Sequence, residues 1–409
     1  MSFALLIAAC HNPAPPAAEG GKELLPAALQ ARVTVEGAIE SVDKLDLHGY
    51  SAHLKIDRVL TTGAPVRPGV TIRLAWEELA SGRGVRLSSG DRVIAALGPA
   101  PGGSLWRQRL LSREESLDVF TLAGNGEGFL RNPSNRDGVI VERYLRLEPA
   151  DRQATAGVHA LTSILVDGSA QLPLSAIALF ASIDGLDTEL DRGDADRWIA
   201  VVGDPRRDIV VRRALLTLMA DRHIVKVSPQ LRALAQPGFD LEADTWESIA
   251  RLAGGLSPAE VERLLASPQA DLRTVGVRWA RSDDFKDRLL VIARTDPAPP
   301  VRATAIETAL QLGGATMLDQ VAVGLVDPDT QVRVRTATAI GLLGAAVIPA
   351  LEGMIGSGSV ERSQGAILAL AQTGPAGREA LLRISATNPD EKMRNLALLA
   401  LGRIESHKH

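Results

Sequence analysis

Acidic side chains gather in one short stretch of this sequence, residues 184–196. Five of them are spaced closely enough to approach a common metal ion, namely Asp187, Glu189, Asp191, Asp194 and Asp196. Carboxylate oxygens are the ligands that Ca²⁺ prefers. However, a calcium loop that starts at Asp187 would place Arg192 where glycine is needed and Trp198 where a bidentate glutamate is needed. The stretch therefore favours a solvated loop between helices, with an irregular calcium site as the alternative.

No other residues have the types and spacing of a known catalytic site. His48 and His53 could share a metal ion, but no acid or thiol is spaced to complete a tetrahedral set of ligands. The single cysteine, Cys10, excludes zinc sites built from several cysteines. The sequence also has no nucleophile elbow, phosphate-binding loop or dinucleotide-binding glycine motif. We therefore predict that the chain is not an enzyme and that it needs no cofactor.

Charge and composition narrow the choice of partners. The 409 residues carry a formal net charge of −4, and only 3% of them are aromatic. Proteins that bind nucleic acid usually present a basic surface, and those that bind single strands add aromatic stacking platforms. We therefore expect no nucleic-acid partner.

Arginine recurs at regular intervals in the second half of the chain. The stretches SPQADLR, DPAPPVR, DPDTQVR and NPDEKMR each begin with Ser, Asp or Asn followed by Pro, and each ends in Arg. Such a first residue caps a helix, and proline suits the first helical position. With two further arginines at compatible spacing, the series comprises Arg212, Arg273, Arg302, Arg333, Arg362 and Arg394. A stripe of small apolar residues follows each one, which predicts helix pairs stacked every ~30 residues as a solenoid.

The motif D-P-x-x-x-V-R before an alanine-rich helix resembles the HEAT repeat, most closely its short bilin-lyase-type form, over residues 200–404. In that family the aspartate and arginine of the motif form a ladder along the stack. The resemblance therefore implies a structural role for the arginine series. The alternative is that these arginines form an anion-binding face. We predict a HEAT-like α-solenoid over residues 149–404, followed by a tail at 405–409.

Residues 31–111 have a different pattern, in which apolar and polar residues alternate between Gly- and Pro-containing turns. Five short strands are predicted, the last of them SLWRQRLL at residues 104–111. The pattern indicates a small antiparallel β-barrel or sandwich within residues 31–148. It is similar to the netrin-like form of the oligonucleotide-binding barrel. We expect residues 112–145 to supply loops and a closing hairpin, so the fold class is mainly α with a β-rich domain in front.

The N-terminal residues indicate a membrane anchor. An apolar block from Phe3 to Ala9 leads into Cys10, and a stretch rich in Pro, Ala and Gly follows. The run Ile7-Ala8-Ala9-Cys10 resembles the lipobox of bacterial lipoproteins, in which the cysteine becomes the new N-terminus and carries the lipid. We therefore expect a signal peptide with a lipobox over residues 1–10 and a flexible tether over 11–30. The resemblance implies a lipid-anchored protein of the bacterial cell envelope, on the periplasmic side or at the surface.

A solenoid presents an extended surface to its partners. We therefore expect a membrane-anchored, non-enzymatic scaffold that binds another protein. The alternative is an accessory or lyase-like subunit that binds an anionic or chromophore-type ligand. A surface of mixed charge with exposed apolar residues would favour the protein partner, whereas an arginine-lined pocket would favour the ligand.

Overall fold

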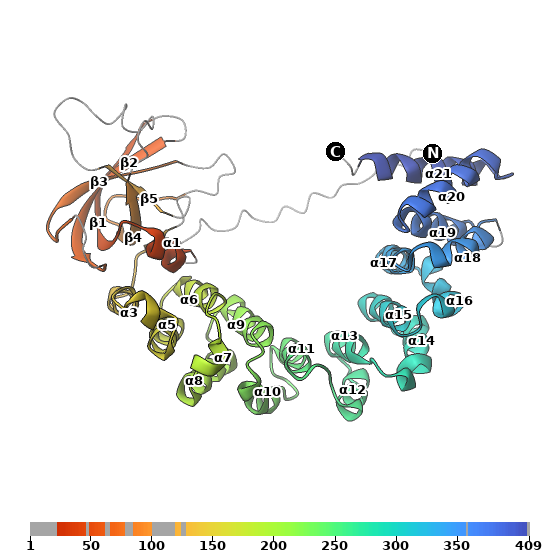
Figure 1. The fold of residues 1–409 in the computed structure, drawn as a ribbon, viewed down its shortest axis with the longest axis horizontal. Coiled ribbons are helices and arrows are strands. Elements are labelled where there is room, and N and C mark those ends of the chain that lie inside the picture. The colour runs from red at the N-terminus through yellow and green to blue at the C-terminus, as the bar shows by residue number, and fades with distance from the viewer. Residues whose placement is uncertain are drawn as a thin grey trace. The chain divides into compact units, whose positions relative to one another are not determined.

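The structure, a computed structural model, describes residues 23–45, 49–61, 66–77, 85–99, 119–123, 128–356 and 359–406. Cys10, His48 and the strand predicted at residues 104–111 lie outside these ranges. Two compact units are present, divided between Ala233 and Leu234. The first contains the β-strands and the first helices, and the second contains helices alone (Figure 1).

The β-strands of the first unit close into a five-stranded barrel. The strands are β1 (Val33–Lys44), β2 (Gly49–Val59), β3 (Thr71–Glu77), β4 (Arg92–Pro99) and β5 (Val119–Leu122). Each strand pairs with two others in the order β1-β2-β3-β5-β4-β1, and β6 (Phe129–Arg131) adds to β4. All of these pairs are antiparallel except β3–β5, which is parallel. The prediction of a small β-barrel is confirmed.

Residues 112–145 differ from the prediction of loops and a hairpin. They contain β5, which closes the barrel, and helix α3 (Asp137–Leu145). Strand β5 has only four residues, too few for an alternating pattern to show in the sequence. Its place in the barrel comes from pairing with β3 and β4, which are distant in the chain.

The barrel coils sharply along β1, whose register with β2 shifts twice. One shift lies between Glu36 and Gly37. A Cβ atom at position 37 would lie 2.1 Å from the carbonyl oxygen of Lys55. Glycine therefore permits the close approach of the two strands that a small barrel requires.

Helix α1 (Leu24–Gln30) lies within the predicted tether of residues 11–30, so that prediction is wrong for this part. Leu24, Leu25, Ala27 and Ala28 are buried, and the helix contacts α6 and β4. The backbone N–H of Leu25 donates a hydrogen bond to Ser175 Oγ at 2.8 Å. Burial of this apolar face anchors a segment whose neighbouring sequence is rich in Pro, Ala and Gly.

Helical pairs complete the first unit. The helices are α4 (Pro149–Arg152), α5 (Thr155–Asp167), α6 (Leu172–Phe180), α7 (Leu186–Glu189), α8 (Arg192–Gly203), α9 (Ile209–Asp221), the 3₁₀ helix η1 (Val225–Val227) and α10 (Ser228–Leu234). Helix α5 packs on α6 and α8, and α9 packs on α6 and α8 in turn. Stacked pairs of this kind are the solenoid pattern.

Polar contacts join the barrel to helix α3, and others join α3 to the residues just before α6. Glu36 on β1 is buried and pairs with Arg92 at 2.8 Å, and Arg58 links Glu36 to Glu142 on α3. Asp137 on α3 is fully buried and accepts hydrogen bonds from the N–H and hydroxyl groups of Ser169. The boundary predicted at residues 148/149 therefore falls inside one compact unit, because α1 contacts both β4 and α6 and because α3 contacts α5.

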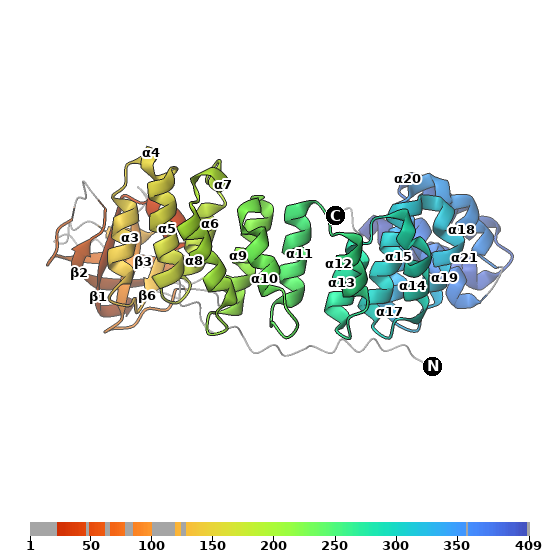
Figure 2. The same ribbon diagram turned by 90° about the horizontal axis from the view of Figure 1, so that it is seen from below.

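The second unit consists of two layers of helices (Figures 1 and 2). Layer A is made of α11 (Glu242–Ala253), α13 (Ala270–Trp279), α15 (Pro299–Gly313), α17 (Thr330–Gly341), α19 (Val360–Gln372) and α21 (Glu391–Ser406). Layer B is made of α12 (Pro258–Leu265), α14 (Lys286–Thr295), α16 (Leu318–Val321), α18 (Ile348–Met354) and α20 (Pro375–Thr387). Short 3₁₀ turns precede or follow several layer-B helices: η2 (Asp283–Phe285), η3 (Gly314–Met317), η4 (Ala322–Val326) and η5 (Gly344–Val347). The predicted HEAT-like α-solenoid is confirmed, and its core lies between the layers.

Residues Pro299–Val326 form one run that is long and apolar enough to cross a membrane by length and composition, with a mean hydropathy of 1.3. A second candidate, Thr330–Gly341 with Gly344–Met354, is bent by 114°. Both runs supply buried side chains to the core of the second unit, among them Ile306 and Ile340. Burial within the repeat stack accounts for their apolar composition.

Candidate functional sites

Two arginines of the series are held by aspartates of the following repeat. Arg273 donates from Nε and Nη2 to the two carboxylate oxygens of Asp296 at 2.8 and 2.9 Å. Arg302 makes the same bidentate contact with Asp327, at 2.8 Å for both bonds. In each case the remaining guanidinium nitrogen donates to backbone carbonyls of the arginine's own turn. These contacts form a ladder that joins the turn of each repeat to the next.

The aspartates of the ladder are ionised more readily than usual. Burial raises the pKa of Asp327, but hydrogen bonds from Arg302 and from the backbone N–H of Asp329 outweigh burial and leave the pKa below its ordinary value. The pKa of Asp296 is lowered in the same way, with burial opposed by hydrogen bonds from Arg273 and Ala298 N–H. Both carboxylates are therefore charged partners of the arginines at neutral pH.

The other members of the series make different contacts. Arg212, which is buried, donates from Nε to the carbonyl of Val202 at 2.7 Å. Arg333 and Arg394 donate to backbone carbonyls at the start of their own repeats, and no ion pair to either is found among the described residues. Arg362 Nε is buried and has no hydrogen-bond partner within the described part of the chain. The ladder contacts thus belong to Arg273 and Arg302, whose following turns contain aspartate.

A groove opens on layer A between α15 and α17. It encloses about 320 Å³ and is lined by the apolar side chains of Leu310, Val334, Ala339, Leu342 and Leu343. We call it the α15–α17 groove. Leu342 is 78% exposed and Val334 is 41% exposed, although both are large apolar residues. Both residues line the same opening, and exposed apolar residues that gather in one place are typical of interaction surfaces.

Charges along the α15–α17 groove compensate one another. Arg335 donates to both carboxylate oxygens of Glu307, at 2.8 and 2.6 Å, and the pair lines the groove. Arg278 on α13 makes a similar bond to Glu247 on α11 at 2.8 Å. Layer A therefore carries paired charges beside an apolar opening, and Arg335, which lines this opening, is bound by Glu307 rather than free to attract an anion.

The acidic stretch does not form a loop that collects all five carboxylates. Asp187 lies on the short helix α7 and is exposed. Glu189 accepts a hydrogen bond from Thr155 Oγ1 at 2.6 Å, and Asp196 accepts one from Gln230 at 3.4 Å. Only Asp191 and Asp194 of the five converge, and they do so with His159. The structure therefore does not bring the five carboxylates of the acidic stretch together at one point.

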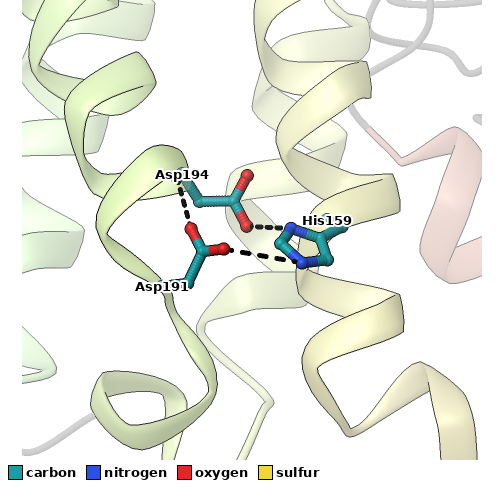
Figure 3. Close-up of side chains that lie close together, drawn as sticks. All are labelled: His159, Asp191 and Asp194. Atoms are coloured by element: carbon teal, nitrogen blue, oxygen red, sulfur yellow. Dashed lines mark hydrogen bonds and ion pairs between the residues drawn. The ribbon is translucent and has the colours of Figure 1, made fainter.

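His159, on α5, lies between these two carboxylates at the start of α8 (Figure 3). Its Nδ1 is 2.5 Å from Asp194 Oδ2, and its Nε2 is 3.7 Å from Asp191 Oδ2. Asp191 caps α8, because its Oδ1 accepts a hydrogen bond from the backbone N–H of Asp194 at 2.7 Å. We call these three residues the His159 cluster. Sequence analysis missed it because His159 stands outside the acidic stretch and has no motif around it.

Burial changes the ionisation of Asp194. It raises the pKa of this carboxyl, and the charge of Asp191 raises it further, while His159 and Arg197 act in the opposite direction. The net result is a pKa above the ordinary aspartate value. A buried carboxylate beside a second carboxylate is costly unless a cation lies nearby.

No protein-family model matches the chain, and no curated protein matches it in sequence. Among solved structures, human deoxyhypusine hydroxylase in complex with glycerol matches at 16% identity and a TM-score of 0.28, over 62% of this chain and 97% of that one. A designed armadillo repeat protein matches at 13% identity and a TM-score of 0.14, over 65% of this chain and 98% of that one.

One prediction from sequence is corrected by these matches. The lack of a recognised catalytic motif led us to predict that the chain is not an enzyme, yet one of the matched helical proteins is a hydroxylase. The lack of a recognised motif does not by itself exclude catalysis. At a TM-score of 0.28 the match also assigns no reaction to this protein.

Proposed function

We propose that this protein is a membrane-anchored helical-repeat scaffold that binds another protein at the α15–α17 groove. The observation that carries the proposal is the exposure of Leu342 and Val334 beside an apolar opening on layer A. Helical solenoids use such extended layers to bind polypeptides. The occupant we infer is an amphipathic helix or extended segment that inserts apolar side chains between α15 and α17.

The charge distribution supports a polypeptide over an anionic ligand. Arg273 and Arg302 are bound by aspartates, and Arg335 is bound by Glu307. The groove is near the lower end of the size range of small-molecule pockets, which is roughly 300–1,000 Å³. An accessory or lyase-like subunit that binds an anionic or chromophore-type ligand would need free cations in such a pocket, so we favour the protein partner.

The resemblances to a short HEAT repeat and to a netrin-like barrel are compatible with this proposal. The Asp-Arg ladder agrees with what the short bilin-lyase-type HEAT repeat implies for its motif. The closed strand order, with one parallel pair, agrees with an oligonucleotide-binding type of barrel, of which the netrin-like form is one. We take the barrel as a second contact surface for protein rather than for nucleic acid, because the chain is acidic overall.

A photo-crosslinking amino acid placed at position 342 tests the groove. We expect it to capture a polypeptide in host cells, because Leu342 is 78% exposed at the opening. Val334→Asp in the same chain should reduce the crosslink at least tenfold by placing a charge in the apolar groove. The readout is the mass-shifted band on a gel, followed by mass spectrometry.

The matched control carries the crosslinker at Val291 on α14, an exposed apolar position in layer B. We expect no specific band from it. Equal capture from positions 291 and 342, or capture at 342 that Val334→Asp leaves unchanged, would contradict binding in the groove. A crosslink to a small anionic molecule instead of a polypeptide would support the alternative function.

The membrane anchor is tested at Cys10. We propose that this residue is lipidated and forms the mature N-terminus in a bacterial envelope, because it follows Ile7-Ala8-Ala9. Cys10→Ala should move the protein from the membrane fraction to the aqueous fraction. Cell fractionation and the intact mass of the purified chain measure the change. Aqueous wild-type protein that retains Met1 would show that the lipobox interpretation is wrong.

A further inference from the structure

We propose that the His159 cluster is a binding site for a divalent transition-metal ion, with Zn²⁺ as the reference ion. The three side chains offer one imidazole nitrogen and two carboxylate oxygens, and these ligand atoms all lie within 4.8 Å of one another. His159 comes from α5, whereas Asp191 and Asp194 come from the first turn of α8 (Figure 3). No function proposed above uses this cluster.

Each carboxylate has one oxygen held by the protein and the other directed at the imidazole. Asp191 Oδ1 accepts the backbone N–H of Asp194, which leaves Oδ2 facing His159. Asp194 Oδ1 lies 3.6 Å from Arg197 Nη1, which leaves Oδ2 facing His159. Protein groups that fix one oxygen of a ligating carboxylate orient the other toward a metal ion.

Asp194 supplies a second, independent indication of a ligand. Its side chain is only 3% exposed, and among the described groups the one partner of its buried Oδ2 is His159 Nδ1, at 2.5 Å. The contact between this oxygen and His159 Nδ1 is an ion pair, which is charged only when the imidazole is protonated. A buried carboxylate is costly when its partner carries no charge, and a cation bound beside a neutral imidazole would remove that cost.

The net charge around the His159 cluster is compatible with a bound divalent cation. Two aspartates face His159, and one nearby cation, Arg197, faces Asp194 and, at 4.0 Å, Asp167. When the imidazole is neutral, the group of two aspartates and Arg197 keeps a net negative charge. A divalent ion would compensate the repulsion between the carboxylates of Asp191 and Asp194, both of which face His159.

The donor set selects the class of metal. Imidazole suits zinc and other first-row transition ions, whereas Ca²⁺ and Mg²⁺ prefer oxygen ligands alone. The side chains of His159 and Asp191 are 49% and 50% exposed, so water can complete the coordination. Typical zinc bond lengths place neighbouring ligand atoms about 3.3 Å apart. Half-exposed His159 must therefore rotate slightly to widen its 2.5 Å contact with Asp194 Oδ2.

Binding would join α5 to the first turn of α8 in the first unit. A ligand that binds the folded state alone stabilises it in proportion to the logarithm of its concentration over Kd. The consequence we infer is that the metal ion locks the contact between these two helices. The site thus stabilises the helices next to the barrel and requires no role in a reaction.

The test uses the full chain, Co²⁺ as a spectroscopic probe and Zn²⁺ as a competitor. We expect wild-type protein to bind one equivalent of Co²⁺ with visible d–d absorption that Zn²⁺ abolishes. His159→Gln and Asp194→Asn should each weaken binding at least tenfold. Asp191→Asn should also weaken it while keeping the helix cap, since asparagine caps helices as well as aspartate does.

His223→Asn is the matched control, because His223 is an exposed histidine of the same unit whose positive φ asparagine tolerates. It should bind the ion as wild type does, and Zn²⁺ should raise the melting temperature of wild type and His223→Asn but not of His159→Gln. Equal Co²⁺ binding by all variants, no saturable binding by wild type, or tighter binding of Ca²⁺ than of Zn²⁺ would overturn the proposal. Should Asp194→Asn fail to fold, the half-exposed variant His159→Gln still decides the result.

Discussion

Arg302→Ala is expected to destabilise the second unit by about 3 kcal/mol, the lower end of the range for breaking a buried ion pair. The Arg302 side chain is 11% exposed and that of Asp327 is 8% exposed, so removal of the guanidinium leaves a nearly buried carboxylate without its cation. The same change removes hydrogen bonds to the carbonyls of Asp296 and Pro297. Hydrogen exchange of the amides in α15 and α17 would report the loss locally, without assuming that the whole chain unfolds in one step.

Arg333→Ala is the matched control, since Arg333 occupies the equivalent repeat position and donates to the carbonyls of Asp327 and Pro328 without an ion pair among the described residues. We expect it to cost no more than about 1–1.5 kcal/mol, the value of ordinary hydrogen bonds. If Arg302→Ala and Arg333→Ala had equal effects, the bidentate pair would not be what stabilises the ladder. If instead Arg302→Ala left exchange unchanged and reduced capture at the groove, the arginine series would act as a binding face.

The cost of Arg302→Ala should also depend on pH. The pKa of folded Asp327 lies below its ordinary value, so the pair contributes stability above the unfolded pKa, near 3.9. That contribution is lost as the pH falls through the folded pKa, because a protonated carboxyl no longer needs the cation. The difference in exchange between wild type and Arg302→Ala should therefore shrink below about pH 4. A difference that stayed constant into acid would argue against the ion pair.

Trp198→Ala is expected to cost the first unit about 3–5 kcal/mol. Trp198 on α8 is fully buried, and its ring meets Phe180 edge-on with centroids 4.5 Å apart. Its indole N–H donates to Thr162 Oγ1 at 3.0 Å, and Thr162 is also fully buried. The substitution leaves a cavity between α5, α6 and α8 and removes the partner of a buried hydroxyl. Urea unfolding followed by circular dichroism, with hydrogen exchange of α5 and α8, measures the effect.

Trp198→Phe separates the effect of the cavity from the effect of the lost hydrogen bond to Thr162. It keeps most of the ring volume against Phe180 and removes the indole N–H, so we expect a loss of about 1–3 kcal/mol from the unpaired hydroxyl. A cost for Trp198→Ala below that of Trp198→Phe would show that the site collapses around the missing ring. Spread of the damage to the second unit would contradict the division of the chain into two compact units.

The repeat architecture could be predicted from sequence because its determinants are local. The Asp-Pro and Ser-Pro steps mark the turns before layer-A helices, which begin three residues after the Ser or Asp, at Ala270, Pro299 and Thr330. The apolar stripe that follows acts within one or two turns of helix. These patterns recur, so one repeat supports the interpretation of the next. The ladder at Arg273 and Arg302 is also local in this sense, because each partner aspartate belongs to the adjacent repeat. The alternation in β1 to β4 was visible for the same reason.

Features that depend on distant pairing were decided by tertiary structure alone. Strand β5 has four residues and becomes a strand because β3 and β4 present free edges to it. Helix α1 is ordered by contacts with α6 and β4, and these same long-range contacts join the barrel to the first helices.

The His159 cluster shows most clearly which features cannot be predicted from the sequence. Asp191 and Asp194 are neighbours in sequence, but His159 reaches them only because α5 packs against α8. The periodicity of a sequence reveals single helices and strands. A site formed by side chains from two helices depends on how those helices pack against each other. The sequence therefore determined the repeats and the β-barrel pattern of this protein. Packing between distant segments decided where the compact units divide and which chemistry-bearing side chains meet.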